Sequence, residues 1–302
     1  MQSVLVSAPA KINLGLAVGP PRADGFHPLH TVYQAVDLCD ELRATHSDDT
    51  GITLTISAGT SDGVPLDERN LAVRAAHALR EHAGIEHGVT LTLRKVIPVS
   101  GGMAGGSADA AAALVACDAL WELGTPREEL LVLAAGLGSD VPFCLVGGTA
   151  LGTGRGEQVS PVLARGTYHW VLGCSERGLA TPEVFAERDR IAGSAGGAPE
   201  VPAELMSALV SGEAASLGAA LHNDLQEAAL SLRPELRAGL SIGTECGALG
   251  AVVSGSGPTL AFLASGPEHA MDLATALAGA QVCDDVLRAM GPVPGARICA
   301  GS

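Results

Sequence analysis

The fold of this chain is indicated most clearly by the stretch Pro98-Val99-Ser100-Gly101-Gly102-Met103-Ala104-Gly105-Gly106-Ser107-Ala108-Asp109. It lies between a β-branched segment at residues 89–93 and an alanine-rich segment at residues 107–123, so we expect a strand before it and a long helix after it. Its four glycines let the backbone approach a ligand closely, and the first helical turn offers unpaired N–H groups at the positive end of the dipole. A polyphosphate needs both features.

Two better-known phosphate loops do not match this stretch. No lysine follows the glycines as in a Walker A loop, and Met103 breaks the spacing of a dinucleotide-binding loop. The catalytic and metal-binding signatures of protein kinases are also absent from the sequence. Taken alone, the stretch fits equally well a glycine-rich turn whose helix is capped by Ser107.

Outward from this loop, strands and helices alternate irregularly. Further strands are expected at residues 3–8 and 52–56, and a helix at residues 71–82. After Leu151, three closely spaced glycines indicate a tight turn near which a second unit begins. The Gly, Ser, Ala and Pro tract at residues 193–202 fits either an interdomain linker or a loop within that second unit.

Composition limits the class of protein. The chain has 302 residues, 47% of them apolar, but only eight are aromatic, so its core must be built mainly from Ala, Leu and Val. A net charge of -15 argues against a nucleic-acid partner, because phosphate-backbone affinity comes from clustered Lys and Arg. With no signal-like or membrane-spanning apolar run, we expect a cytoplasmic protein.

Two residue types stand out by number. Only Lys11 and Lys95 are lysines among the 18 basic residues, which suggests a specific need for an ammonium at one or both, although chance surface lysines are the alternative. The seven cysteines are odd in number and include no CxxC pair, so we expect buried, reduced thiols and neither a disulfide framework nor a zinc site.

Two other stretches give the loop its context. Ser7-Ala8-Pro9-Ala10-Lys11-Ile12-Asn13-Leu14 precedes it, and Val253-Ser254-Gly255-Ser256-Gly257-Pro258-Thr259-Leu260 follows it. In this order the three resemble the three motifs of the GHMP kinase superfamily. The resemblance implies that ATP phosphates are bound by Pro98, Val99, Ser100, Gly101, Gly102, Met103, Ala104, Gly105, Gly106, Ser107 and Ala108.

Four shorter segments narrow the resemblance to one family. They are Asp24-Gly25-Phe26-His27, Gly138-Ser139-Asp140-Val141-Pro142-Phe143, Thr181-Pro182-Glu183-Val184-Phe185 and Asn223-Asp224-Leu225. They are similar to segments of the diphosphocytidyl-methylerythritol kinases. The resemblance implies ATP-dependent phosphorylation of the 2-hydroxyl of 4-diphosphocytidyl-2-C-methyl-D-erythritol, in non-mevalonate isoprenoid biosynthesis.

The same resemblance assigns the catalytic residues. It implies that Asp140 accepts the proton of the substrate hydroxyl, that Lys11 neutralises charge and keeps Asp140 ionised, and that Asn13 orients the substrate hydroxyls. Phosphoryl transfer needs positioning and charge stabilisation more than a strong base, which agrees with these residue types. The alternative for Asp140 is a helix N-cap, because it precedes Pro142 at the start of an expected helix.

The resemblance also assigns a cytidine site. Phe26 and Phe185 would sandwich the cytosine ring, and His27 would read its polar edge. Thr181 and Pro182 would complete the second wall. Phe26 stands where the family commonly has Tyr, which preserves stacking but removes any hydroxyl contact. By themselves each Phe fits a core position, and His27 fits a hydrogen-bonded structural histidine.

The implied architecture is an α+β fold of two domains. Residues 1–157 would form an ATP-binding domain like domain 2 of ribosomal protein S5, and residues 158–302 a ferredoxin-like domain. Mg²⁺ would bridge the ATP phosphates with Ser107 as a ligand. The expected partner is a small molecule, with no nucleic acid and no membrane, and the chain is expected to be a monomer or weak homodimer.

Two rival functions keep parts of this pattern. A homoserine or mevalonate kinase would retain the three motifs but lack the paired cytidine walls at Phe26 and Phe185. A noncatalytic metabolite sensor on the same fold would not need both Lys11 and Asp140.

Overall fold

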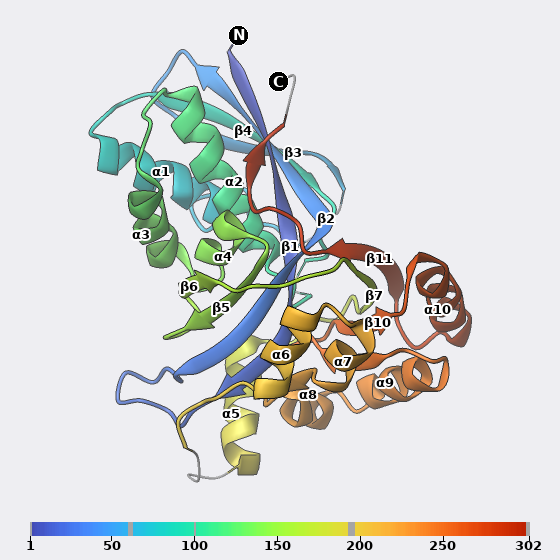
Figure 1. Cartoon of the computed structure of the whole chain (residues 1–302). Helices are drawn as coiled ribbons and strands as arrows, with labels where there is room; N and C mark the ends of the chain where they lie inside the picture. Colours follow the sequence, from blue (N-terminus) through green and yellow to red (C-terminus); the bar gives the residue numbers. More distant parts are fainter. Residues whose placement is uncertain (1, 60–62, 100, 193–196, 300–302) are drawn as a thin grey trace.

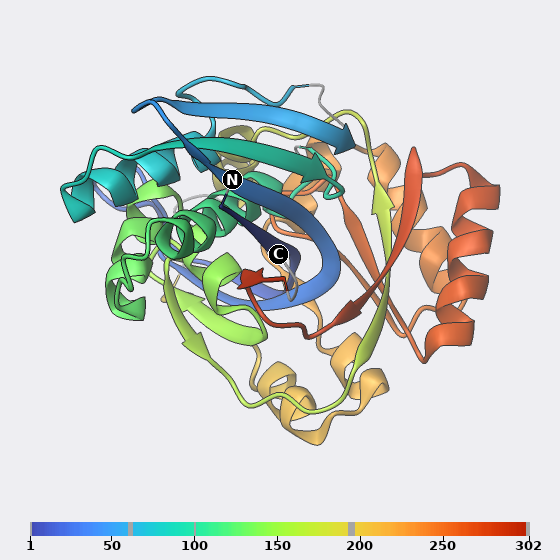
Figure 2. The same ribbon diagram turned by 90° about the horizontal axis from the view of Figure 1, so that it is seen from above.

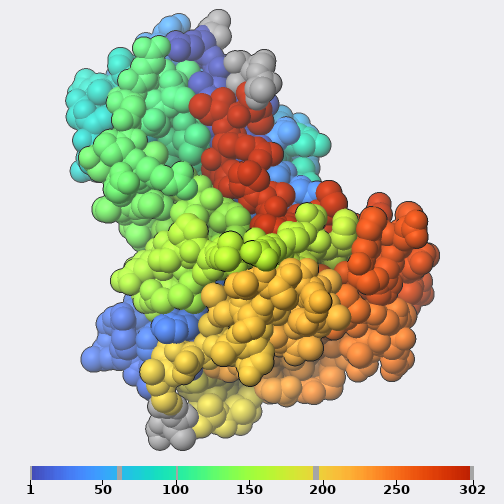
Figure 3. All heavy atoms as spheres, viewed as in Figure 1, coloured from blue at the N-terminus to red at the C-terminus, as the bar shows by residue number. Residues whose placement is uncertain are grey.

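A computed structural model describes residues 2–59, 63–99, 101–192 and 197–299 of the chain. Helices pack on two separate β-sheets, as Figure 1 shows. In Figure 3 most of the blue-to-green atoms of the first half form one lobe and the yellow-to-orange atoms form the other, with a stretch of blue atoms beside the yellow ones. The red C-terminal segment runs back over the first lobe. The α+β class with two lobes is therefore confirmed.

The larger sheet has eight strands within the described residues, with β12-β1-β2-β4-β3 as its main order. Strand β5 pairs with β2 and β6, and β8 pairs with β1. The strands are β1 (Ser3–Val18), β2 (Leu29–Ser47), β3 (Ile52–Gly59), β4 (Gly88–Lys95), β5 (Thr149–Thr153), β6 (Gln158–Pro161), β8 (His222–Asn223) and β12 (Arg297–Ile298).

The first strand is much longer than the segment at residues 3–8 that the sequence indicated. Strand β1 pairs with β2 along its whole length, with register shifts between Pro9 and Ala10 and between Asn13 and Gly15. Because β2 pairs with β4 beyond Glu41 but with β5 over residues 31–34, the two long strands connect both ends of the sheet. The first motif thus lies mid-strand, where the bulges redirect its side chains.

Four helices belong to the first lobe and lie together on one side of the larger sheet, as Figure 2 shows. They are α1 (Leu71–Ala83), α2 (Gly105–Leu120), α3 (Arg127–Leu137) and α4 (Val141–Val146). Helix α1 begins after Asn70, whose side chain accepts from the Ala72 amide, and ends at the left-handed Gly84. Helix α2 packs its alanines against β1 and β2, because small side chains permit a close approach.

The second sheet is antiparallel, in the order β11-β7-β10-β9. Its strands are β7 (Tyr168–Cys174), β9 (Gly250–Val253), β10 (Leu260–Ala264) and β11 (Asp285–Gly291). The helices of this half are α5 (Thr181–Ala192), α6 (Ala203–Ser211), α7 (Ala214–Ala219), α8 (Gln226–Leu232), α9 (Glu235–Glu245) and α10 (Pro267–Ala280). Helices α9 and α10 pack on the sheet, in the ferredoxin-like arrangement that was expected.

The two lobes are not formed by two consecutive halves of the chain, because the C-terminal strand β12 returns to the sheet of the first lobe. The boundary expected between residues 157 and 158 falls between β5 and β6, which pair with each other in the larger sheet. Near the C-terminus, Ile298 of β12 pairs with Val6 of β1. That boundary stays a prediction.

The tract at residues 193–202 joins α5 to α6, both in the second half, so its described part is a loop within that unit. Residues 193–196 of the tract lie outside the described residues.

The expectation of reduced thiols agrees with the structure, in which no disulfide joins any of the described cysteines. Burial is uneven: Cys117, Cys144 and Cys174 are buried, but Cys246 at the end of α9 is exposed. The expectation that all are buried is therefore wrong for Cys246. Burial raises the pKa of Cys174 to about 12, which keeps this thiol protonated near neutral pH.

Candidate active site

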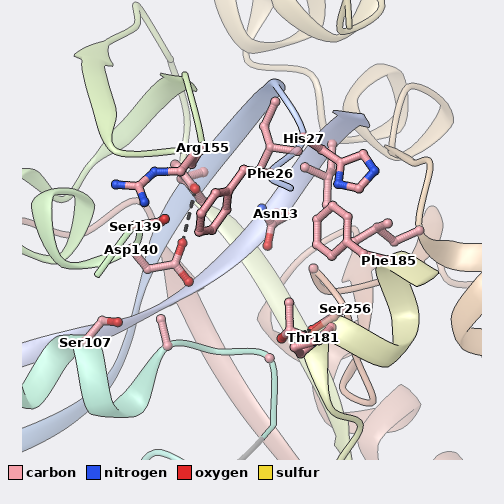
Figure 4. A pocket seen from close by; sticks show the side chains of 18 of the residues that line it. Asn13, Phe26, His27, Ser107, Ser139, Asp140, Arg155, Thr181, Phe185 and Ser256 are labelled. Atoms are coloured by element: carbon pink, nitrogen blue, oxygen red, sulfur yellow. Dashed lines mark hydrogen bonds between the residues drawn. The ribbon is translucent and has the colours of Figure 1, made fainter. Parts of the chain in front are cut away.

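A cleft of about 710 Å³ lies between the two lobes. Residues from both halves face it, as Figure 4 shows for ten of them. The first lobe contributes β1, the β1–β2 loop, the glycine-rich loop and the turn before α4, whereas the second contributes α5 and the loop after β9. The three motifs, distant in sequence, meet here.

Lys11 and Asp140 face each other across the middle of this cleft. The Nζ atom of Lys11 lies 3.6 Å from Oδ2 of Asp140 and donates a 2.7 Å hydrogen bond to Oδ1 of Asn13. Lys11 and Asn13 are two residues apart on β1, so both side chains point to the same face of the strand. The Lys11 side chain is 6% exposed and that of Asp140 is 31% exposed.

Asp140 occupies the N-cap position of α4, but its carboxylate makes no capping hydrogen bond. The carboxylate oxygen Oδ1 instead accepts a 3.1 Å hydrogen bond from the hydroxyl of Tyr33, drawn as the dashed line in Figure 4. The N-cap alternative therefore describes the backbone only, and the carboxylate remains directed into the cleft. Burial and the neighbouring Asp140 charge raise the pKa of Tyr33, so its hydroxyl stays a donor.

Asn13 is buried, and its amide is already engaged. Its Nδ2 donates a 2.8 Å hydrogen bond to the Thr31 hydroxyl, and its Oδ1 accepts from Lys11. These bonds fix the direction of the Lys11 ammonium. A role for Asn13 in contacting substrate hydroxyls, as the resemblance implied, stays a prediction.

The glycine-rich loop lies at one end of the cleft, at the N-terminus of α2. Gly102 and Ala104 both have positive φ angles, 74° and 60°, which bends the backbone sharply before the helix begins at Gly105. Of the expected ATP-binding residues, Gly102, Ala104 and Ser107 line the cleft. Figure 4 shows the Ser107 hydroxyl on the first turn of α2.

Other members of the expected ATP-binding set lie deeper. Met103 is fully buried, and its carbonyl accepts a 3.1 Å hydrogen bond from the Lys11 amide. Ala108 is also buried, with its amide bonded to the Ala104 carbonyl, so it acts within the helix. Ser100 lies outside the described residues.

The third motif braces this loop. A Cβ atom added at Gly102 would lie 2.7 Å from the carbonyl oxygen of Ser254, so only glycine permits the contact. The carbonyl oxygens of Val253 and Gly255 accept hydrogen bonds of 2.7 and 2.8 Å from Asn223. The Asn223-Asp224-Leu225 segment therefore has a structural role: Asn223 holds two carbonyls of the third motif, and that motif contacts the glycine-rich loop.

Lys95 lies under the loop, fully inside the protein, and pairs with two carboxylates. Its Nζ contacts Oδ2 of Asp40 and donates a 2.7 Å hydrogen bond to Oδ2 of Asp109 on α2. Oδ1 of Asp40 accepts from the amides of Val96 and Ile97, where the loop begins. The alternative of a chance surface lysine is therefore wrong for Lys95.

Charge in this cluster is unbalanced, because two buried carboxylates share one ammonium. Burial raises the pKa of Asp109 to about 7, although Lys95 opposes the shift. Oδ1 of Asp109 has no hydrogen-bond partner among the described residues.

Aromatic side chains occupy the opposite end of the cleft. Figure 4 shows Phe26 and Phe185 projecting into it from the two lobes, with His27 beside Phe185. The His27 and Phe185 rings lie 5.0 Å apart at an angle of 32°, whereas Phe26 is 51% exposed. The hydroxyl of Thr181 bonds Ser256 of the third motif at 2.9 Å, and Pro182 also lines the cleft.

Sequence reasoning missed several residues at this end and in the centre. The guanidinium of Arg155 lies 4.9 Å from the centre of the Phe26 ring, and Asp189 pairs with His27. Tyr33 bonds the carboxylate of Asp140. Tyr33 could have been suspected as one of only two tyrosines in the chain. The Arg and Asp carry no such signal, because the chain has many of each.

Comparison with known proteins agrees with this geometry. The family model described as "GHMP kinases N terminal domain" matches residues 70–148, and "GHMP kinases C terminal" matches residues 205–281. A 4-diphosphocytidyl-2-C-methyl-D-erythritol kinase of Thermobifida fusca is 55% identical over 98% of both chains. The chain belongs to the 4-diphosphocytidyl-2-C-methyl-D-erythritol kinase family. A relative of the same name from Mycolicibacterium smegmatis is 54% identical over 98% of this chain and 92% of its own.

Solved structures extend the family comparison. A crystal structure of 4-(cytidine 5'-diphospho)-2C-methyl-D-erythritol kinase has a TM-score of 0.76 and 32% identity, covering 96% of this chain and 98% of its own. A homoserine kinase from Cytophaga hutchinsonii has a TM-score of 0.77 over 99% of this chain and 98% of its own, but at 21% identity it shows a shared fold alone. Among the described residues, no helix has the length and apolarity to span a membrane.

Proposed function

We propose that the protein transfers the γ-phosphoryl group of ATP to the 2-hydroxyl of 4-diphosphocytidyl-2-C-methyl-D-erythritol. The observation that carries the proposal is a single cleft with the Lys11–Asp140 pair in its middle, the glycine-rich loop at one end and Phe26 and Phe185 at the other. The names of relatives 54% and 55% identical over nearly the full chain support the same substrate.

Asp140 is the proposed proton acceptor. As the 2-hydroxyl oxygen bonds to the γ-phosphorus, its proton passes to the carboxylate, and the bond from phosphorus to the bridging oxygen breaks to release ADP. Oδ1 of Asp140 already accepts from Tyr33 and Oδ2 faces Lys11, so Tyr33 and Lys11 hold the carboxylate in place.

The phosphates are proposed to bind against the loop at residues 101–107. The N-terminal turn of α2 supplies the amides of Gly105 and Gly106, which have no carbonyl partner within the helix, and the left-handed backbone at Ala104 turns the chain into that helix. With a net charge of -15, the protein offers no long-range attraction for ATP, so these local amides and Lys11 must hold the phosphates.

The donor chemistry of the cleft also suits Mg²⁺. Ser107 and Asp140 present oxygen atoms to the same space, and Mg²⁺ prefers oxygen ligands together with phosphates and water. We propose Ser107 as the ligand on the protein. When bound, the ion would neutralise charge on the ATP phosphates.

The cytidine is proposed to lie between Phe26 and Phe185, with His27 at its edge. Such stacking contributes about 1–3 kcal/mol per base in single-stranded nucleic-acid binding. The family resemblance and a small-molecule substrate also suggest action in the cytoplasm as a monomer or weak homodimer.

The experiment is a substrate panel. Purified protein with ATP and Mg²⁺ is offered the diphosphocytidyl-methylerythritol, homoserine and mevalonate, and the new phosphate is located by ³¹P NMR. Phosphorylation at the 2-position of the first compound alone is expected. Faster turnover of homoserine or mevalonate would overturn the substrate, and no turnover of any compound would support the noncatalytic alternative.

A further inference from the structure

One face of α5 carries three residues that line the cleft at intervals of four. Thr181, Phe185 and Asp189 lie one above another along this face, because side chains at i and i+4 share a side of a helix. Thr181 contacts the third motif and Phe185 contacts the His27 ring. Asp189 pairs with His27, but this pair has not yet been given a function.

The carboxylate of Asp189 contacts the edge of the His27 ring through both of its oxygens. The Nε2 atom of His27 lies 3.1 and 3.0 Å from the two carboxylate oxygens of Asp189. Arg188 donates to Oδ1 of Asp189 at 3.1 Å and also bonds the Val18 carbonyl of β1, so the carboxylate is anchored across the lobes. The His27 side chain is only 8% exposed, and its ring is held on its face by Phe185 and on its edge by Asp189.

This pairing determines where the ring carries its proton. An ionised carboxylate only accepts hydrogen bonds, so Nε2 of His27 must bear the hydrogen that lies between them. In the neutral imidazole, Nδ1 is then an acceptor. Among the described residues no group hydrogen-bonds Nδ1, and His27 lines the cleft.

We propose that Asp189 is a positioning residue for base specificity, which locks His27 in its Nε2–H tautomer so that Nδ1 accepts a hydrogen bond from an exocyclic amino group of the bound base. This rests on the proposed cytidine substrate. Cytosine offers an amino group at its 4-position and uracil offers a carbonyl there, so an acceptor at this point favours cytosine. Stacking on the aromatic rings does not distinguish the two bases.

The first test needs no substrate and no activity. Long-range ¹H–¹⁵N correlation at pH 8.5, where imidazoles are ordinarily neutral, reports the tautomer of each histidine ring, and a His27→Gln variant assigns the signal. The Nε2–H form is expected for His27. An Nδ1–H form would overturn the proposal. Because the tautomer is measured on the parent protein, this result does not depend on whether the Asp189 variant folds.

The second test compares the cytidine substrate with its uridine analogue. In Asp189→Asn the side-chain amide can either donate to or accept from Nε2, so it no longer selects one tautomer of His27. The ratio of kcat/KM for the cytidine substrate to that for the uridine analogue is therefore expected to fall about tenfold, which corresponds to one hydrogen bond. The kcat for saturating cytidine substrate should stay within about twofold, because Asp189 touches no reacting group. An unchanged ratio in a folded Asp189→Asn protein would overturn the proposal.

Glu183→Gln is the matched control. It removes the same charge from an exposed position on the same helix, outside the cleft lining, and should leave the ratio unchanged. An equal fall in this control would show that general electrostatics sets the ratio and would overturn the proposal. If the parent enzyme turned over neither nucleotide compound, the proposed function would fail, while the tautomer measurement would still stand by itself.

Discussion

The Nζ atom of Lys11 lies 3.6 Å from Oδ2 of Asp140 and is held there by a shorter, 2.7 Å hydrogen bond to Asn13. The ammonium is thus within ion-pair distance of the carboxylate, but Tyr33, whose hydroxyl lies 3.1 Å from Oδ1, is its closer partner. Oδ2 accepts no hydrogen bond from the described residues, so in the proposed reaction it is available to accept the proton of a bound alcohol. We therefore propose that Asn13 contributes to catalysis through the direction it gives to Lys11.

Loss of either charged residue should reduce turnover with the fold intact. Lys11→Ala and Asp140→Asn are each expected to lower kcat at least about a hundredfold, from lost charge stabilisation and lost proton transfer. Steady-state kinetics measures the effect, and circular dichroism checks folding. Asp48→Asn is the control: it removes an exposed carboxylate that does not line the cleft, and it should not change kcat. If Asp140→Asn kept most of its turnover, the proposed base would be wrong.

The phosphate loop should affect ATP more than the cytidine substrate. Ser107→Ala is expected to raise KM for ATP while leaving the affinity for the cytidine compound nearly unchanged. Gly105→Val is less selective, because a Cβ atom there would lie 3.2 Å from Ile97 and 3.3 Å from the Lys95 ammonium. Separate titrations of the two ligands distinguish the effects. Equal losses in Ser107→Ala would contradict a role restricted to phosphate.

The aromatic walls should determine affinity for the nucleotide substrate. Phe26→Ala and Phe185→Ala are each expected to raise KM for the cytidine compound about tenfold or more, with KM for ATP nearly unchanged. Phe185→Ala should have the larger effect, because it also removes the ring that packs 5.0 Å from His27. Ile191→Ala, an exposed change on the same helix, is the control. Unchanged KM in both Phe variants would refute the cytidine site.

The buried cluster of Lys95, Asp40 and Asp109 under the glycine-rich loop should contribute more to the stability of the protein than an exposed ion pair does. Lys95→Met leaves Asp40 and Asp109 buried without their cation, and we expect a loss of about 3–5 kcal/mol in the free energy of unfolding. Arg94→Met, next along the strand, removes only an exposed pair with Glu41 and should cost less than about 1 kcal/mol. Urea denaturation measures both. Similar losses in the two variants would be inconsistent with this account.

Asp109 should make stability depend on pH in an unusual direction. Burial raises its pKa from the ordinary 3.8 to about 7, so between these values the folded protein holds a proton that the unfolded chain releases. Its contribution to stability is therefore present at low pH and is lost as the pH rises through about 4 to 7. Relative to the parent, Asp109→Asn should become more stable across this window. A constant difference between the two denaturation curves would contradict the shift.

Much of the fold and site could be predicted from local sequence. The glycines at residues 101–106 and the alanines that follow specify a loop and helix through backbone freedom and close packing, which are properties of those residues alone. The order of three motifs and the segments around Phe26 and Phe185 pointed to one family, and a relative at 55% identity confirms that family. Strand limits were less accurate, because β1 extends through bulges that its partner β2 stabilises.

What only the tertiary structure decided are the relationships between residues far apart in the chain. Tyr33 reaches Asp140 and Asp189 reaches His27 because β2 and α5 carry them there, and no local pattern encodes such pairings. The place of Lys95 was ambiguous for the same reason, since its two carboxylates come from β2 and α2. The sequence by itself determined which residues could bind phosphate and nucleotide, because that depends on their own chemistry. The fold determined which proton, charge and ring each one meets, because those contacts depend on distances that only packing sets.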